Sequence, residues 1–136
     1  MYYETILTLP ANTLQTDPVR QILPIHPGTI QHVEVLFPPG CAALAHVQVL
    51  YWCHQLWPSN PDSFFSGNGY PISYDEDLQI VDPPYELELV GWNEDDTYAH
   101  HPILRVQVVP LGGTTNDILS RIFLGAAGPI TDAAGG

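Results

Sequence analysis

Residues 45–53, with the sequence AHVQVLYWC, decide the fold of this chain. Alternate positions in this stretch form an apolar set and a mixed set, namely Ala45, Val47, Val49 and Tyr51 against His46, Gln48, Leu50 and Trp52. A period of two residues places one set on each face of a β-strand, so we expect the first set to face a core and the second to face outward. Such alternation is typical of antiparallel sheets, because strands of parallel sheets are covered on both faces.

The same alternation recurs along the chain. It is strong in residues 31–37, 85–92 and 103–109, and weaker in residues 2–9, 19–23, 55–57, 70–74 and 78–81. Turn-forming residues cluster between these runs, at 38–40, 58–62, 66–69 and 82–84. About eight short strands joined by such turns predict an all-β fold, a single antiparallel β-sandwich and most simply a jelly roll. An immunoglobulin-type sandwich is the alternative, but the Cys-Trp-Cys spacing of that family is missing.

The end of the chain differs in composition from the rest. We expect the sandwich domain to occupy residues 1–110 and a C-terminal extension to occupy residues 111–136. Polar residues offer an N-cap for a short helix over about residues 116–124, and a flexible or arm-like tail of small residues follows. The extension either folds back on the sandwich or docks as an arm on a neighbouring subunit. In the second case its apolar residues are interface candidates, namely Ile118, Ile122 and Phe123.

Charge is the most informative feature of the composition. The chain has 15 acidic residues, 3 arginines and no lysine, which gives a formal net charge of -12. Nucleic-acid binding requires clustered Lys and Arg, so this class of partner is excluded. Only 13% of residues are charged, against roughly a quarter in ordinary soluble domains. A protein surface with so few charged residues favours burial against neighbouring subunits.

The compartment and the redox state follow from simple signals. The first residues, MYYETILTLP, lack the basic leader and apolar core of a signal peptide, so we expect synthesis in the cytoplasm. No apolar run approaches the roughly 20 residues of a membrane span.

Cys41 and Cys53 cannot form a zinc finger alone. We interpret them as buried free thiols, with a disulfide between neighbouring strands as the alternative.

Two acidic clusters are weak calcium candidates, because calcium prefers hard oxygen ligands in loops. Their residues are Asp75, Asp77 and Asp82 in the first cluster, and Glu94, Asp95 and Asp96 in the second. Neither has the spacing of an EF-hand, so solvated turns are the favoured interpretation. The second cluster lies between two strong strands, where residues 93–98 are expected to form a hairpin loop. We therefore expect no metal and no cofactor.

Catalytic signatures are missing from the sequence. It contains no GxSxG elbow, no glycine-rich phosphate loop and no HxH pair of the kind that a cupin metal centre uses. Six histidines are present, but surface or interface positions are the default for them. We expect a protein that is not an enzyme, and a small metal-dependent jelly-roll enzyme remains an alternative.

Aromatic residues concentrate in the middle of the chain. Core and loop packing is the first interpretation, and an anchor set for a protein interface is the second. The interface candidates are Trp57, Phe64, Phe65, Tyr70 and Trp92. A glycan-binding platform is the third interpretation, in which Trp57, Tyr70 and Trp92 stack on sugar rings.

In size and in predicted architecture, residues 2–110 and the extension after them resemble the small jelly-roll proteins of virus and phage particles, which serve as capsid, cement or decoration subunits. This resemblance implies a non-enzymatic structural subunit of a virion or another large homomeric assembly. Its partners are then copies of itself and other shell or coat proteins. A carbohydrate-binding β-sandwich module is the alternative function.

Overall fold

The computed structural model describes residues 1–110, which form eight β-strands and no helix. The strands are β1 (Tyr2–Ile6), β2 (Val19–Pro24), β3 (Gly28–Leu36), β4 (Ala45–Tyr51), β5 (His54–Trp57), β6 (Pro71–Ile80), β7 (Glu86–Asn93) and β8 (Ile103–Pro110). The predicted extension at residues 111–136 lies outside the described residues, and with it lie the expected helix and the interface candidates Ile118, Ile122 and Phe123.

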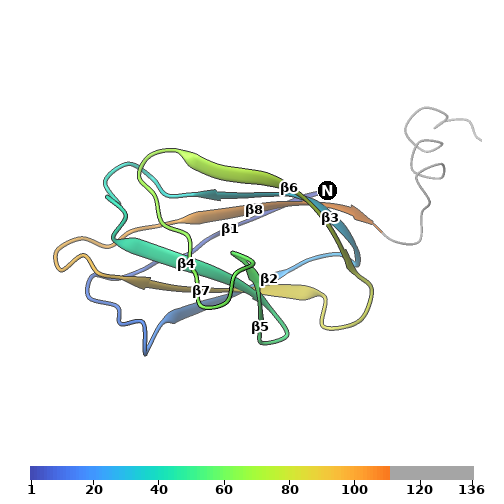
Figure 1. The fold of residues 1–136 in the computed structure, drawn as a ribbon, viewed down its shortest axis with the longest axis horizontal. Helices are drawn as coiled ribbons and strands as arrows, with labels where there is room; N and C mark the ends of the chain where they lie inside the picture. Colours follow the sequence, from blue (N-terminus) through green and yellow to red (C-terminus); the bar gives the residue numbers. More distant parts are fainter. Residues whose placement is uncertain (111–136) are drawn as a thin grey trace, which may run out of the picture.

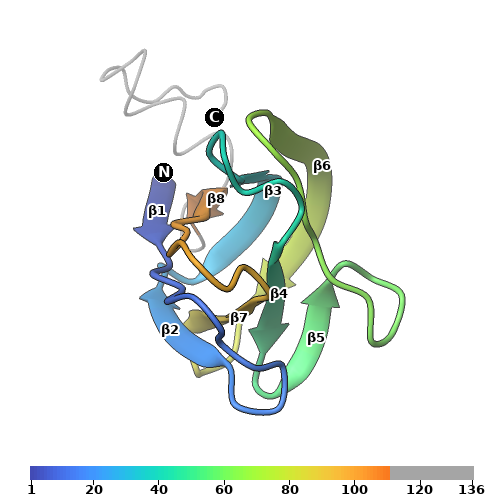
Figure 2. The same cartoon turned by 90° about the vertical axis from the view of Figure 1, so that its left-hand side faces the viewer.

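The strands form two antiparallel sheets packed face to face (Figures 1 and 2). Sheet 1 has the order β1-β8-β3-β6 and sheet 2 has the order β2-β7-β4-β5. The first half of the chain pairs with the second half in reverse, as β1·β8, β2·β7, β3·β6 and β4·β5. This long double strand is rolled up so that β3 also pairs with β8 and β4 with β7. Such a path is that of a jelly roll, and the predicted β-sandwich is confirmed.

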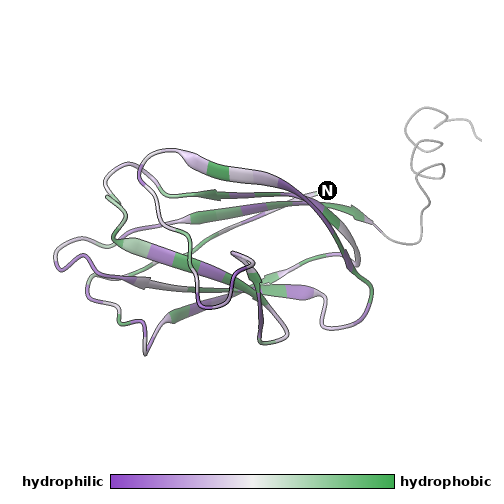
Figure 3. Ribbon diagram, viewed as in Figure 1, coloured by the Kyte–Doolittle hydropathy of each residue, from purple (hydrophilic) through white to green (hydrophobic). Residues whose placement is uncertain are grey.

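The core lies between the sheets and consists of the alternating apolar sets (Figure 3). Val33 and Val35 of β3 and Val47 and Val49 of β4 belong to this core, and all four are fully or almost fully buried. Burial of one such side chain stabilises the fold by about 1.5–3 kcal/mol. The period of two residues therefore predicted the inward set correctly.

Two details of the predicted strands are wrong. Residues 70–74 and 78–81 belong to one strand, β6, because Asp75, Glu76 and Asp77 continue the alternation rather than form a turn. A register shift opposite β3 between Ile30 and His32 accommodates the extra length. The predicted hairpin at residues 93–98 instead connects sheet 2 to sheet 1, since β7 and β8 lie in different sheets.

The two cysteines form no disulfide. Cys41 is buried in the core, and desolvation there raises the pKa of its thiol, with a smaller contribution from the charge of Asp95. Cys53 is exposed in the β4–β5 turn, so the expectation that both thiols are buried holds for Cys41 alone. Within residues 1–110 the structure contains no helix long and apolar enough to cross a membrane.

Candidate functional site

An aromatic cluster covers one end of the outer face of sheet 2. His46 on β4 lies beside Trp92 on β7, with ring centroids 5.5 Å apart. Phe65 pairs with Val47 through two backbone hydrogen bonds, and this places the neighbouring Phe64 over the imidazole. The Phe64 ring contacts His46 and Trp92 edge to face at centroid distances of 4.6 and 5.1 Å. An outward-facing tryptophan thereby becomes buried.

The His46 imidazole is fixed by a carboxylate. Its Nε2 lies 2.6 Å from Oε2 of Glu94, while its Nδ1 is buried without a hydrogen-bond partner among the described residues. The Glu94 side chain itself is mostly exposed. This residue therefore joins the buried aromatic cluster to the surface beside it.

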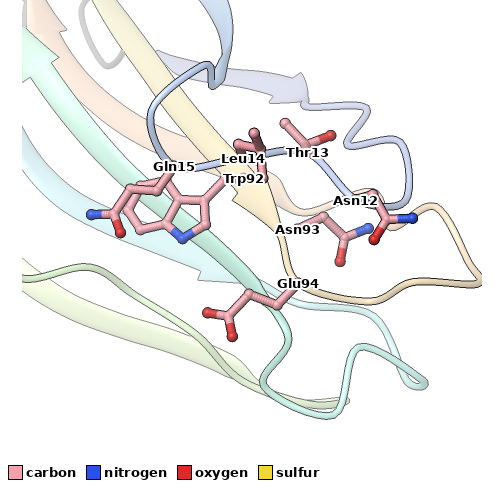
Figure 4. A pocket seen from close by; sticks show the side chains of 7 residues that line it. All are labelled: Asn12, Thr13, Leu14, Gln15, Trp92, Asn93 and Glu94. Atoms are coloured by element: carbon pink, nitrogen blue, oxygen red, sulfur yellow. The ribbon is translucent and has the colours of Figure 1, made fainter.

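A hollow of about 330 Å³ opens at that surface (Figure 4). Its walls come from the β1–β2 connection and from the end of β7 with the residue that follows. The lining residues are Asn12, Thr13, Leu14, Gln15, Trp92, Asn93 and Glu94. They offer amide, hydroxyl and carboxylate groups but no serine or cysteine nucleophile. The arrangement can bind a polar group by hydrogen bonds.

Asn93 holds the walls of the hollow together. Its side-chain amide donates to the carbonyl oxygens of Leu9, Pro10 and Tyr98 at 3.2, 3.3 and 2.9 Å. Its Oδ1 accepts a hydrogen bond from the backbone N–H of Asp95 at 2.9 Å. The residue is only 1% exposed. One buried side chain thus joins the β1–β2 connection to the β7–β8 connection.

Asp95 organises the β7–β8 connection from within. Its carboxylate accepts hydrogen bonds from the backbone N–H groups of Thr97 and Tyr98, and it lies 2.8 Å from Nε2 of the buried His100. The hydrogen bond from Thr97, followed by that from His100, holds the pKa of this carboxyl below its usual range. The ionised form is therefore the one that stabilises the folded loop.

This lowered pKa predicts a pH-dependent effect of Asp95→Asn. The ionised carboxylate stabilises the native state above the unfolded pKa of about 3.9, and this contribution is lost as the pH falls through the lower folded pKa. We expect the variant to be less stable than the wild type at pH 6 and the difference to shrink below about pH 3.9. Urea unfolding at a series of pH values measures it. The control is the exposed Asp96→Asn, and a difference that stays constant down to pH 2 contradicts the assignment.

The calcium candidates do not assemble into a metal site. Among the described residues, no three His, Cys, Asp or Glu side chains are grouped so that they could hold a metal ion. The carboxylates are engaged elsewhere: Asp75 pairs with His32 at 3.0 Å, Glu94 with His46, Asp95 with its own loop, and Asp96 with the Thr97 hydroxyl. Asp77 and Asp82 lie on β6 and just after it, apart from the second cluster.

The structure places the described interface candidates at different depths. Trp57 and Trp92 are 2% and 3% exposed, so neither presents a ring face to a sugar or a partner. Trp57 instead donates its indole N–H to Glu76, and Phe65 packs against the core. Phe64 and Tyr70 remain accessible, at 39% and 62% exposure.

Several accessible apolar residues were missing from the sequence-based candidates, and Trp52 and Ile6 are two of them. Trp52 is 69% exposed in the β4–β5 turn, and Ile6 is 52% exposed at the end of β1. The alternation did assign Trp52 to an outward set, which was the available signal. It could not separate this residue from Trp92, which is also outward-facing but is covered by Phe64.

No protein-family model matches the chain, and no curated protein matches it.

Proposed function

We propose that the chain is a non-enzymatic structural subunit of a large homomeric assembly, of the kind that forms the capsid, cement or decoration layer of a virus or phage particle. One observation carries this proposal. The outer face of sheet 1 bears a row of apolar side chains that crosses all four strands, and no third layer of the described chain covers it.

The register of sheet 1 defines this row. Ile6 pairs with Ile103, Ile103 with Leu36, and Leu36 with Pro71. All four lie at positions that alternate with less exposed residues of their strands, so they face outward. Neutral apolar surface of this kind is a liability in a monomer and a contact surface in an assembly.

The neighbouring row of the same face carries one guanidinium between two carboxylates, which together have a net charge of -1. Arg105 lies 2.8 Å from Glu34 and 3.4 Å from Glu4. The hydrogen bond with Glu34, which is the largest effect, raises the pKa of the guanidinium above its usual value. The guanidinium offsets one of the two carboxylates, and this lowers the repulsion between two copies that meet at the apolar row of a chain with a formal net charge of -12.

The two edge strands of sheet 1 differ in how strongly their side chains oppose pairing with a strand of another chain. The edge strand β6 carries Asp75, Glu76 and Asp77 in succession, and charges of this kind oppose pairing with another chain. The other edge strand, β1, carries Glu4 as its single charged side chain and exposes Tyr2 and Ile6. Contacts between copies are thus favoured at the β1 side, where the apolar row begins.

The substitution Ile6→Glu tests this proposal. We expect the wild type to associate to a mass several-fold above 15.0 kDa, and the variant to associate at least about tenfold more weakly, because a charge is then buried in the contact. Size-exclusion chromatography with light scattering over a range of concentrations measures both. Val81→Glu is the matched control, since Val81 is equally exposed but lies after β6.

A shortened chain of residues 1–110 separates the roles of the sandwich and of the extension. The whole jelly roll lies within these residues, so we expect this chain to unfold cooperatively and to assemble less well than the full chain. A wild-type protein that remains a 15.0 kDa monomer at high concentration contradicts the proposed homomeric assembly.

A further inference from the structure

The turn between β4 and β5 has an unusual composition for its geometry. Tyr51 pairs with His54, so Trp52 and Cys53 form a two-residue loop. Both have left-handed backbone angles, with φ of 49° and 66°. This is the turn that normally requires Asn and Gly, and a bulky residue there is an outlier. The chain thus holds a 69% exposed indole at the tip of a hairpin.

A second hollow, of about 230 Å³, lies beside this indole. Its lining residues are Ile22, Trp52, Cys53, Pro84, Glu86 and Glu88. On the outer face of sheet 2, Glu88 pairs with both Leu50 and Ile22, so the carboxylates stand between apolar neighbours. The volume is below the roughly 300–1,000 Å³ of small-molecule sites, and it suits a single side chain.

The chemistry of the hollow selects a cation with an apolar stem. Glu88 is 3.4 Å from Arg20, and no salt bridge to Glu86 occurs among the described residues. An exposed indole attracts a cation over its ring face, and a guanidinium can stack there while it donates to a carboxylate. Ile22 and Pro84 provide apolar surface for the methylene groups of such a side chain.

We infer that this hollow binds Arg121, together with the apolar residues beside it, from the C-terminal extension of a neighbouring copy. This inference rests on the homomeric assembly proposed above. The chain has no lysine and three arginines, and two of them, Arg20 and Arg105, form salt bridges within the sandwich. Arg121 is the basic residue of the extension and stands in the sequence ILSRIF, residues 118–123.

The charge of the segment around Arg121 and its position in the sequence both fit this occupant. An arginine flanked by Ile118, Leu119, Ile122 and Phe123 matches the Glu86 carboxylate, which has no salt bridge within residues 1–110 and lies in a hollow lined partly by apolar residues. Arg121 follows the last residue of β8, Pro110, by 121 − 110 = 11 positions. Even a fully extended chain of eleven residues spans only about 36–40 Å, which limits how far from the end of β8 the site that binds this arginine can lie.

A charge exchange tests the contact. We expect Arg121→Glu and Glu86→Arg each to weaken self-association about tenfold or more, and the chain with both substitutions to recover most of it. Light scattering measures the association. The control combines Arg121→Glu with Asp77→Arg on β6, which has the same net charge as the exchange but no reason to recover. Equal recovery in that control, or wild-type association of Arg121→Glu, overturns the inference.

Fluorescence quenching identifies the copy that supplies the arginine. Trp52 is the accessible tryptophan of the three, because Trp57 and Trp92 are buried. We expect acrylamide quenching to fall as the wild-type protein is concentrated, and to stay high in Arg121→Glu. Protection that does not depend on concentration assigns the contact to the same chain and overturns the inference. If the wild-type protein is a monomer, the proposed assembly is wrong. If the protein assembles and Arg121→Glu does not change its association, only the proposed contact is wrong.

Discussion

Replacement of Asn93 by alanine is expected to lower the free energy of unfolding by about 4 kcal/mol, because it removes four hydrogen bonds at a buried position. The carbonyl oxygen of Tyr98 and the N–H of Asp95 then lose their partner, whereas the carbonyl oxygens of Leu9 and Pro10 keep hydrogen bonds from the N–H of His100 and the Thr13 hydroxyl. Each buried polar group left without a partner costs about 1–3 kcal/mol, and water that enters the site recovers part of this. Urea unfolding measures the loss.

The matched control is Asn68→Ala. Asn68 is exposed, and its Oδ1 accepts one hydrogen bond, from the backbone N–H of Gly40 at 2.8 Å. We expect this variant to lose less than about 1 kcal/mol, because water replaces the missing acceptor. Losses of similar size in the two variants contradict the assignment of Asn93 as the residue that joins the two connections.

Asn93 also shows where prediction from the sequence ends. The alternation in residues 45–53 and 103–109 located the strands and their buried faces, because a period of two residues depends only on neighbours in sequence. In the sequence, Asn93 is one polar residue at the start of an acidic turn. Its partners Leu9 and Pro10 lie 84 and 83 positions away. Its role depends on the jelly-roll path, which brings these segments together.

The strand order itself shows the same limit. Proline and glycine clusters predicted the connections, but they carry no information on whether the next strand joins the same sheet. The connection after β7 was therefore expected to be a hairpin, although it crosses to β8 in sheet 1. The hollow beside Trp52 could not be predicted from the sequence either. It depends on the pairing of β7 with β2 and β4, which places Glu86 and Glu88 beside the turn.

The substitution Gly28→Ala is expected to lower the free energy of unfolding by about 3 kcal/mol, because sheet 1 has no room for a side chain at this position. A Cβ atom at Gly28 would lie 2.2 Å from the carbonyl oxygen of Val109 and 2.8 Å from Cγ1 of Val108. The nearer atom belongs to the backbone, so no change of rotamer relieves the contact. Strands β3 and β8 must separate where Gly28 pairs with Pro110.

The control for this prediction is Gly67→Ala. Gly67 is also buried, but a Cβ atom there meets only the Phe37 side chain, at 3.4 Å or more, which is ordinary contact. We expect this variant to change the free energy of unfolding by less than about 1 kcal/mol. Chemical denaturation of both variants gives the comparison. Because Pro110 is the last residue before the extension in the sequence, Gly28→Ala also alters the end of β8 to which the extension is joined. It should therefore weaken self-association as well as stability, whereas Gly67→Ala should leave both unchanged.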